Sequence, residues 1–75
     1  MKNLRVGDKV APIDLGVVKE IDAFSVEGDF AGIISASSPA TIFHIETYKE
    51  KKVLYVRLQN GKVGTVESWV VKNLQ

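Results

Sequence analysis

The side chains that could carry acid–base, nucleophilic or metal chemistry are few and scattered in this sequence. His44 is its only histidine, and there is no cysteine; one imidazole without thiolates or a nearby carboxylate pair makes a poor metal site. None of the five serines has a candidate base other than His44, so no hydroxyl is set up as a nucleophile. Glu27 and Asp29 flank Gly28, as carboxylates in an exposed turn do. We therefore expect a non-enzymatic protein with no catalytic residue, no metal ion and no cofactor.

Basic and aromatic side chains offer a second kind of chemistry, the binding of single-stranded nucleic acid. Bases stack on aromatic rings and phosphates pair with lysine or arginine where the two types alternate on a sheet face. The candidate residues for such a site are Lys49, Lys51, Lys52, Arg57 and Lys62, next to Tyr48 and Tyr55. Glu46 and Glu50 lie close by and dilute the positive charge, and lysines at a hairpin tip also protect a strand edge from aggregation. Nucleic-acid binding is therefore the alternative prediction and not the first.

Length and composition limit the chain to one small globular domain, residues 1–75. Hydrophobic residues make up 45% of the sequence and charged residues 25%, which are globular proportions. Without disulfides, oligomerisation is the remaining common way to stabilise so short a chain. The net charge of +1 neither requires nor excludes nucleic acid. No apolar run reaches the roughly 18 residues of a membrane-spanning helix, and the first residues lack the apolar core of a signal peptide, so we expect a cytoplasmic protein without membrane contact.

Short runs of valine, isoleucine, phenylalanine and tyrosine between turn residues predict β-strands along most of the chain. Asn60-Gly61, between residues 55–59 and 62–66, predicts a two-residue hairpin with a type I′ turn. Lys49-Glu50-Lys51-Lys52 is expected to form a four-residue loop that joins residues 42–48 to residues 53–59. The expected cross-strand partners are Tyr48 with Val53, Ile45 with Val56, Phe43 with Leu58, Leu58 with Val63, and Val56 with Thr65.

These registers place one set of side chains on a common inner face of a three-stranded meander over residues 42–67. The expected inner residues are Phe43, Ile45, Thr47, Leu54, Val56, Leu58, Val63 and Thr65. The opposite face is mostly polar, but it holds a small apolar patch that needs a cover or a partner. The patch consists of Tyr48, Val53, Tyr55 and Val66. Tyrosine anchors inside a charged rim are typical of protein interfaces. The expected partner-binding residues are Tyr48, Val53, Tyr55, Arg57 and Val66.

The first half of the chain predicts further short elements. Residues 6–10 are expected to be a turn that leads into a strand, with Pro12 at a strand end or sheet edge because proline lacks an N–H. Residues 15–21 predict a second strand. Residues 23–41 are expected to be a long insertion, either a β-hairpin around residues 27–29 or an ordered loop.

The end of the chain is too short for a helix of several turns. Residues 68–71 predict one turn of 3₁₀ helix, followed by a short closing strand. Trp69 is expected to plug one end of the fold, and an exposed Trp69 would instead indicate a binding hot spot.

Both ends of the sequence resemble SH3-like small β-barrels of the KOW and Tudor type. The resemblance rests on residues 6–10 (Val-Gly-Asp-Lys-Val) and 16–21 (Gly-Val-Val-Lys-Glu-Ile), and on residues 55–62 followed by Val66, Trp69 and Leu74. It covers about half of the chain and does not include residues 23–41. The resemblance implies an all-β, five-stranded barrel with a single 3₁₀ turn near the C-terminus. SH3-like barrels bind RNA, DNA or peptides, and a few are enzymes, so the fold leaves the function open.

The first functional prediction is a small binding module for protein–protein interaction, with a second copy of the chain among the partners to consider. The alternative is a nucleic-acid-binding module of the KOW or Tudor kind. A remote alternative is an oligomeric enzyme with its site at a symmetry axis, because a plasmid-borne, trimethoprim-insensitive dihydrofolate reductase is also a short SH3-like chain acting as a tetramer. The polar and aromatic residues of that active site are absent from residues 63–66 (Val-Gly-Thr-Val) here.

Overall fold

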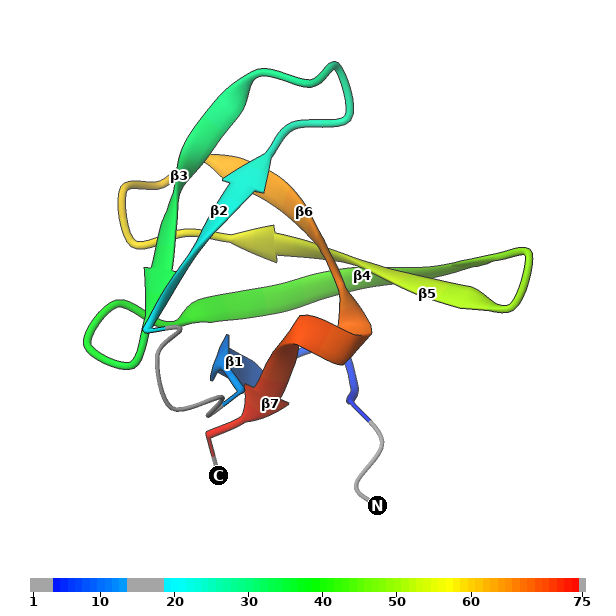
Figure 1. Ribbon diagram of the computed structural model, residues 1–75, viewed down its shortest axis with the longest axis horizontal. Helices are drawn as coiled ribbons and strands as arrows, with labels where there is room; N and C mark the ends of the chain where they lie inside the picture. Colours follow the sequence, from blue (N-terminus) through cyan, green and yellow to red (C-terminus); the bar gives the residue numbers. More distant parts are fainter. Residues whose placement is uncertain (1–3, 14–18, 75) are drawn as a thin grey trace.

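The computed structural model describes residues 4–13 and 19–74 of the protein. In this part of the chain there are seven β-strands and one turn of 3₁₀ helix, and there is no α-helix (Figure 1). The strands are β1 (Lys9–Pro12), β2 (Glu20–Phe24), β3 (Phe30–Ser35), β4 (Ala40–Tyr48), β5 (Lys51–Arg57), β6 (Val63–Glu67) and β7 (Val71–Asn73), with the 3₁₀ turn η1 (Ser68–Val70) before β7. The predicted all-β fold and 3₁₀ turn are confirmed, whereas the expected number of five strands is wrong.

The seven strands form one antiparallel sheet in the order β3-β2-β6-β5-β4-β1-β7. β4 is the longest strand, and it pairs with β1 near its start and with β5 along most of its length. The sheet curls, so that β1 and β3 lie close together although they are not neighbours in the sheet (Figure 1). Curling gives the sheet an inner face, which encloses the core, and an outer face.

The inner face carries the hydrophobic core. Its largest fully buried side chains are Val10, Ile34, Ile42, Leu54 and Val56, which come from β1, β3, β4 and β5. No polar or charged residue is buried in the described part of the chain. A Cβ atom on Gly64 of β6 would lie 2.9 Å from the Cβ of Ala23 in β2, so the two strands approach this closely only because Gly64 has no side chain.

The hairpin between β4 and β5 turns through two residues instead of four. Tyr48 pairs with Lys51. Lys49 and Glu50 both have positive φ angles, 48° and 70°, as the central residues of a type I′ turn do. The expected four-residue loop and its pairing of Tyr48 with Val53 are therefore wrong.

A β-bulge in β4 changes which of its side chains point inward. The register against β5 shifts between Ile42 and His44, so Phe43 is the extra residue. Ile42 is fully buried, whereas Phe43 and His44 are both exposed. The expected inward position of Phe43 is wrong because simple alternation does not hold across a bulge. The observed pairs are Ile42 with Val56 and Ile45 with Leu54.

The Asn60-Gly61 turn is one residue longer than expected. The Leu58 N–H donates to the Lys62 carbonyl at 2.8 Å, and Gly61 has a φ of 86° while Asn60 does not have a positive φ. A type I′ turn needs positive φ at both central residues, so it does not form here. Asn60 instead uses its side chain, which donates to the Ala31 carbonyl of β3 at 2.9 Å and accepts from the Lys62 N–H at 2.8 Å. The side chain of Asn60 thereby fastens the turn to β3.

The longer turn shifts β6 by one position against β5. Val56 pairs with Gly64 and not with Thr65. A shift of one residue exchanges the two faces of a strand, so Val63 and Thr65 face outward, and Val66 is only 8% exposed. The expected faces of Val63, Thr65 and Val66 are therefore wrong. Leu54, Val56 and Leu58 are buried as predicted, Ile45 is half-buried, and Thr47 is exposed.

Strands β2 and β3 form a hairpin in the middle of the chain. Phe24 pairs with Phe30, so of the two structures expected for residues 23–41 the hairpin around residues 27–29 is confirmed. β2 begins at Glu20, and residues 15–18 of the predicted second strand lie outside the described residues. Pro12 is the last residue of β1, as its missing N–H predicts.

Candidate binding surface

Four of the five predicted partner-binding residues lie on the outer face of β4 and β5. They are Tyr48, Val53, Tyr55 and Arg57. Val66, the fifth, packs against the core and does not lie on this outer face. The outer face therefore lacks one apolar residue of the predicted patch.

The outer face gains aromatic residues that the sequence pattern did not place there. Cross-strand pairing joins Phe30 to Phe24, Phe24 to Thr65, Thr65 to Tyr55, and Tyr55 to His44, across five strands. The bulge adds Phe43 beside His44. We call Phe24, Phe30, Phe43, His44 and Tyr55 the outer aromatic row. Phe24 could have been found from the alternation of β2, had the hairpin been chosen over a loop. Phe30 could not, because the register against β2 shifts at Ala31 and alternation from the buried Ile34 would place Phe30 inward.

The rings of the outer aromatic row contact one another in two groups. Phe24 and Phe30 meet edge to face with their centroids 5.9 Å apart, and Phe43 and His44 each meet Tyr55 edge to face at 6.3 Å and 5.2 Å. The Phe30, Phe24 and Phe43 side chains nevertheless stay 55%, 43% and 42% exposed. Apolar rings held in fixed positions and left open to solvent are suited to binding, because little conformational entropy is lost when a partner covers them.

Glu46 connects two members of the row through its carboxylate. Its Oε1 lies 3.3 Å from the Nε2 of His44, and its Oε2 accepts from the Tyr55 hydroxyl at 3.4 Å. Desolvation of the Tyr55 phenol raises its pKa, and the negative charge and hydrogen bond of Glu46 raise that pKa further. Tyr55 therefore presents a neutral hydroxyl at physiological pH.

The five candidate nucleic-acid-binding residues do not form one patch. Lys49, Lys51 and Lys52 lie at the β4–β5 hairpin tip, where the Lys49 ammonium sits 5.5 Å from the ring centre of Tyr48. Arg57 lies at the other end of β5, with its guanidinium 5.9 Å from the ring centre of Phe43. Six residues of extended strand, about 20 Å, separate the two ends. Lys62 belongs to the turn beyond Arg57. The basic residues thus lie at the two ends of β5, on opposite sides of the outer aromatic row, which crosses the strands.

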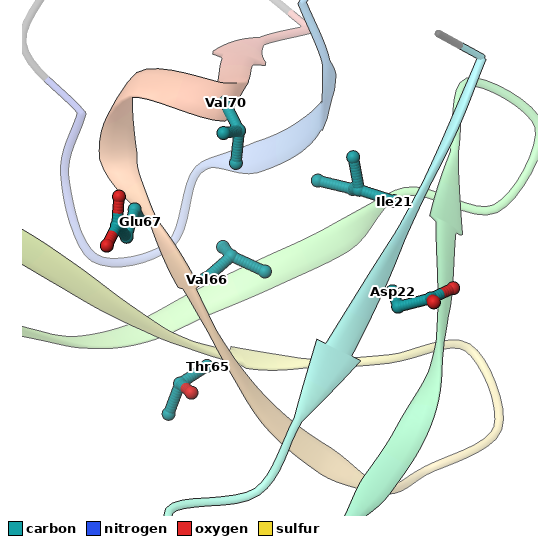
Figure 2. Close-up of a pocket in the computed structure, with 6 residues that line it drawn as sticks. All are labelled: Ile21, Asp22, Thr65, Val66, Glu67 and Val70. Carbon is teal, nitrogen blue, oxygen red and sulfur yellow. The ribbon is translucent and has the colours of Figure 1, made fainter. Parts of the chain in front are cut away.

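Hollows open along the edges of β6, and two of them involve residues of the candidate surface. The first, with a volume of about 240 Å³, lies between the β2–β3 loop and the outer face, and its lining includes Val26, Tyr55, Val63 and Thr65. The second, of about 330 Å³, lies between β2, β6 and η1 (Figure 2). It is lined by Ile21, Asp22, Thr65, Val66, Glu67 and Val70.

Trp69 projects from η1 and does not plug the fold. Its side chain is 67% exposed, so the predicted plug is wrong. The indole N–H donates to the carboxylate of Glu67, one of the residues that line the second hollow. An exposed tryptophan with a fixed position is typical of binding hot spots, the role that the sequence assigned to an exposed Trp69.

Comparison with known proteins finds no counterpart: no protein-family model, no curated protein and no solved structure matches the chain. Among residues 4–13 and 19–74, no three histidine, aspartate or glutamate side chains gather as metal ligands would. The same residues include no helix with the length and hydrophobicity needed to cross a bilayer.

Proposed function

We propose that the protein is a non-enzymatic binding module that recognises a protein surface through the outer aromatic row. The observation that supports this function is the placement of Phe30, Phe24, Tyr55 and Phe43 along one line of cross-strand neighbours, with Thr65 between the two groups of rings. The three phenylalanine rings of this line are exposed. Aromatic residues are enriched at protein interfaces and supply much of their binding energy. A second copy of the chain is the first partner to test, because a domain of this size often gains stability by associating.

The charges around the row favour a protein partner over nucleic acid. Arg57 and Lys51 on the outer face are accompanied by Glu46, Asp22 and Glu67. A phosphate backbone needs a basic surface along its length, whereas a rim of both signs complements another protein's rim. Nucleic-acid binding by the aromatic rings and the five basic residues remains the second candidate.

We also propose that this all-β fold is an SH3-like barrel. With hairpin β2–β3 set aside, five strands remain in the order β7-β1-β4-β5-β6, and the 3₁₀ turn η1 precedes the last of them. This arrangement supports an SH3-like barrel with hairpin β2–β3 inserted between β1 and β4. The insertion then includes the start of β2 at residues 20–21, which the resemblance had assigned to the barrel, and not only the expected residues 23–41. An inserted hairpin would account for the seven strands and for the two phenylalanines that lengthen the outer row.

Sedimentation equilibrium over a wide range of protein concentration tests the proposed function. We expect the wild-type chain to associate, and Phe24→Ser and Phe43→Ser to weaken association at least tenfold, as loss of an interface anchor does. Leu74→Ser is the matched control, because Leu74 is also an exposed apolar residue but follows β7 at the far edge of the sheet. Association that persists unchanged in both phenylalanine variants would contradict a role for the row in self-recognition.

An oligonucleotide titration decides between the two candidates. If the proposed function is correct, amide resonances of residues 24, 30, 43 and 55 should not move when short single- or double-stranded oligonucleotides are added at low salt. Shifts that concentrate at residues 44–62 and vanish as salt is added would favour nucleic acid instead, because counterion release makes phosphate binding salt-dependent.

A further inference from the structure

The hollow between β2 and β6 is a gap in the sheet. The two strands pair only through Phe24 and Thr65, where the Thr65 hydroxyl donates to the Phe24 carbonyl at 2.9 Å. Beyond this pair the strands diverge, as Figure 2 shows, and η1 closes the far end. The gap has a volume of about 330 Å³, which is enough for one large apolar side chain and part of its neighbours.

Apolar side chains converge inside the gap. Ile21 of β2, Val66 of β6 and Val70 of η1 point toward one another from its three sides (Figure 2). Ile21 and Val70 pack against the core while remaining half-buried. The gap thus presents apolar surface that is continuous with the core, and a ligand that filled it would gain the hydrophobic contribution of covering that surface.

The mouth of the gap is acidic. Strand alternation places Asp22 and Glu67 on the outer side of the sheet, next to the inward-facing Ile21 and Val66. Figure 2 shows the two carboxylates on opposite sides of the gap, that of Asp22 on the β3 side of β2 and that of Glu67 beside β6. No lysine or arginine is among the described residues that line it. The Asp22 side chain makes no ion pair or hydrogen bond with another described residue. Negative charge at the mouth repels phosphates and carboxylates and attracts cations.

Trp69 extends the same site. Trp69 does not itself line the gap, but its indole N–H donates to Glu67, which does, and its ring is exposed. A tryptophan face attracts lysine and arginine cations more strongly than other rings do. Carboxylates, an aromatic face and an apolar gap together match an extended peptide in which an apolar residue stands next to a basic one.

We propose that the gap between β2 and β6 binds a basic segment of a partner protein, with one apolar side chain inserted between Ile21, Val66 and Val70. The lysine or arginine residues on either side of that side chain pair with Asp22 on one side of the gap and, on the other, with Glu67 beside the Trp69 ring. This site is distinct from the outer aromatic row, with which it shares Thr65 as a neighbour, and it does not depend on self-association.

Peptide titrations of the full chain test this site. The probes are short blocked peptides with Lys-Leu-Lys, Lys-Ser-Lys or Glu-Leu-Glu at the centre, each flanked by glycine and serine. Trp69 is the only tryptophan, so its fluorescence reports binding at the mouth. We expect Lys-Leu-Lys to change this fluorescence and to shift the amide resonances of residues 21, 22, 66, 67 and 70. Lys-Ser-Lys should bind at least tenfold more weakly, because it cannot fill the apolar gap, and Glu-Leu-Glu should not bind.

Charge variants separate this site from unspecific attraction. Asp22→Asn and Glu67→Gln should each weaken Lys-Leu-Lys binding about two- to fivefold, the size expected for an exposed ion pair, and the double variant should weaken it further. Asp29→Asn removes an exposed carboxylate in the β2–β3 loop and should leave binding unchanged. Equal binding of Lys-Leu-Lys and Glu-Leu-Glu, equal losses in Asp29→Asn, or no shifts at the gap with any probe would overturn the proposal. None of these outcomes bears on the sedimentation of the aromatic-row variants.

Discussion

At the scale of single residues, side chains on the outer face position one another through ring contacts and hydrogen bonds. Tyr55 is the centre of this group, because it contacts the rings of Phe43 and His44 and donates to Glu46. Its partial burial and the nearby carboxylate both favour the neutral phenol and raise its pKa. Asn60 has a similar role in the β5–β6 turn. Its side-chain amide donates a hydrogen bond to the Ala31 carbonyl of β3 and accepts one from the Lys62 N–H within the turn.

The first prediction concerns the ionisation of Tyr55. The folded pKa lies above the ordinary tyrosine value of about 10, so the neutral phenol contributes stability that is fully present below pH ~10 and is lost as pH rises through the folded pKa. In Tyr48→Phe, Tyr55 is the only tyrosine, and phenolate absorbance should titrate with a midpoint above that of an unfolded reference peptide. Glu46→Gln should lower the midpoint, and Glu50→Gln at the hairpin tip should not. A midpoint at or below the peptide value would show that desolvation and Glu46 do not act as described.

At the scale of elements, neither hairpin of the meander has the turn that its sequence favours. Asn-Gly, the preferred pair for a type I′ turn, instead takes part in a longer turn with positive φ at Gly61 alone. The type I′ turn falls on Lys49 and Glu50, which both adopt positive φ. Positive φ costs an ordinary L-residue about 1–2 kcal/mol, so the β4–β5 tip is held by the pairing of the strands on either side and not by its own residues.

The second prediction follows from this strain. Replacing Lys49 by Asn together with Glu50 by Gly should raise the free energy of unfolding by about 1 kcal/mol, since Asn-Gly adopts a type I′ turn readily and part of the gain is offset by the flexibility of glycine. Urea denaturation measures the change. The matched control is Lys51→Asn with Lys52→Gly, which places the same pair inside β5 and should lower stability. If the control pair stabilised the protein instead, the loop would extend over four residues after all.

At the scale of the whole molecule, the curled sheet depends on the close approach of β2 to β6. A Cβ atom on Gly64 would lie 2.9 Å from the Cβ of Ala23 and 3.3 Å from that of Ala31. This contact brings hairpin β2–β3 against the meander, aligns Phe24 with Tyr55 through Thr65, and lets the strands separate again to form the gap. The outer aromatic row and the gap thus both depend on one small residue.

The third prediction tests this dependence. Gly64→Ala should destabilise the protein by about 1–3 kcal/mol through overpacking, although alanine in place of glycine in an unobstructed strand is stabilising by roughly 0.5–1 kcal/mol. Ala23→Gly combined with Gly64→Ala should recover part of the loss, because the clashing methyl group is removed; a double-mutant cycle from urea denaturation gives the coupling. Additive effects of the two substitutions would mean that the strands do not meet at these residues.

Local patterns in the sequence determined the class of structure. Alternating Val, Ile and aromatic runs predicted an all-β chain, Pro12 predicted a strand end, and the Ser68–Val70 region predicted the 3₁₀ turn, because each follows from backbone geometry within a few residues. The inward positions of Leu54, Val56 and Leu58 were also predictable, since β5 has no bulge within it. Four of the five expected partner-binding residues belong to this regular part of the sheet or its tip.

Only the tertiary structure determined the registers of β4 and β6 against β5. These registers determined which side chains lie on the outer face. The bulge at Phe43 and the extra residue in the Asn60-Gly61 turn each reverse the facing of the residues that follow, because strand side chains alternate with a period of two. Phe43 therefore moved to the outer face and Val66 into the core. The longer turn is stabilised by a local hydrogen bond, from the Lys62 N–H to the Asn60 side chain, and by one from that side chain to the carbonyl of Ala31, 29 residues away. The second bond is not visible in the local sequence. The gap beside Trp69 arises in the same way, from two strands that meet at one pair and then diverge.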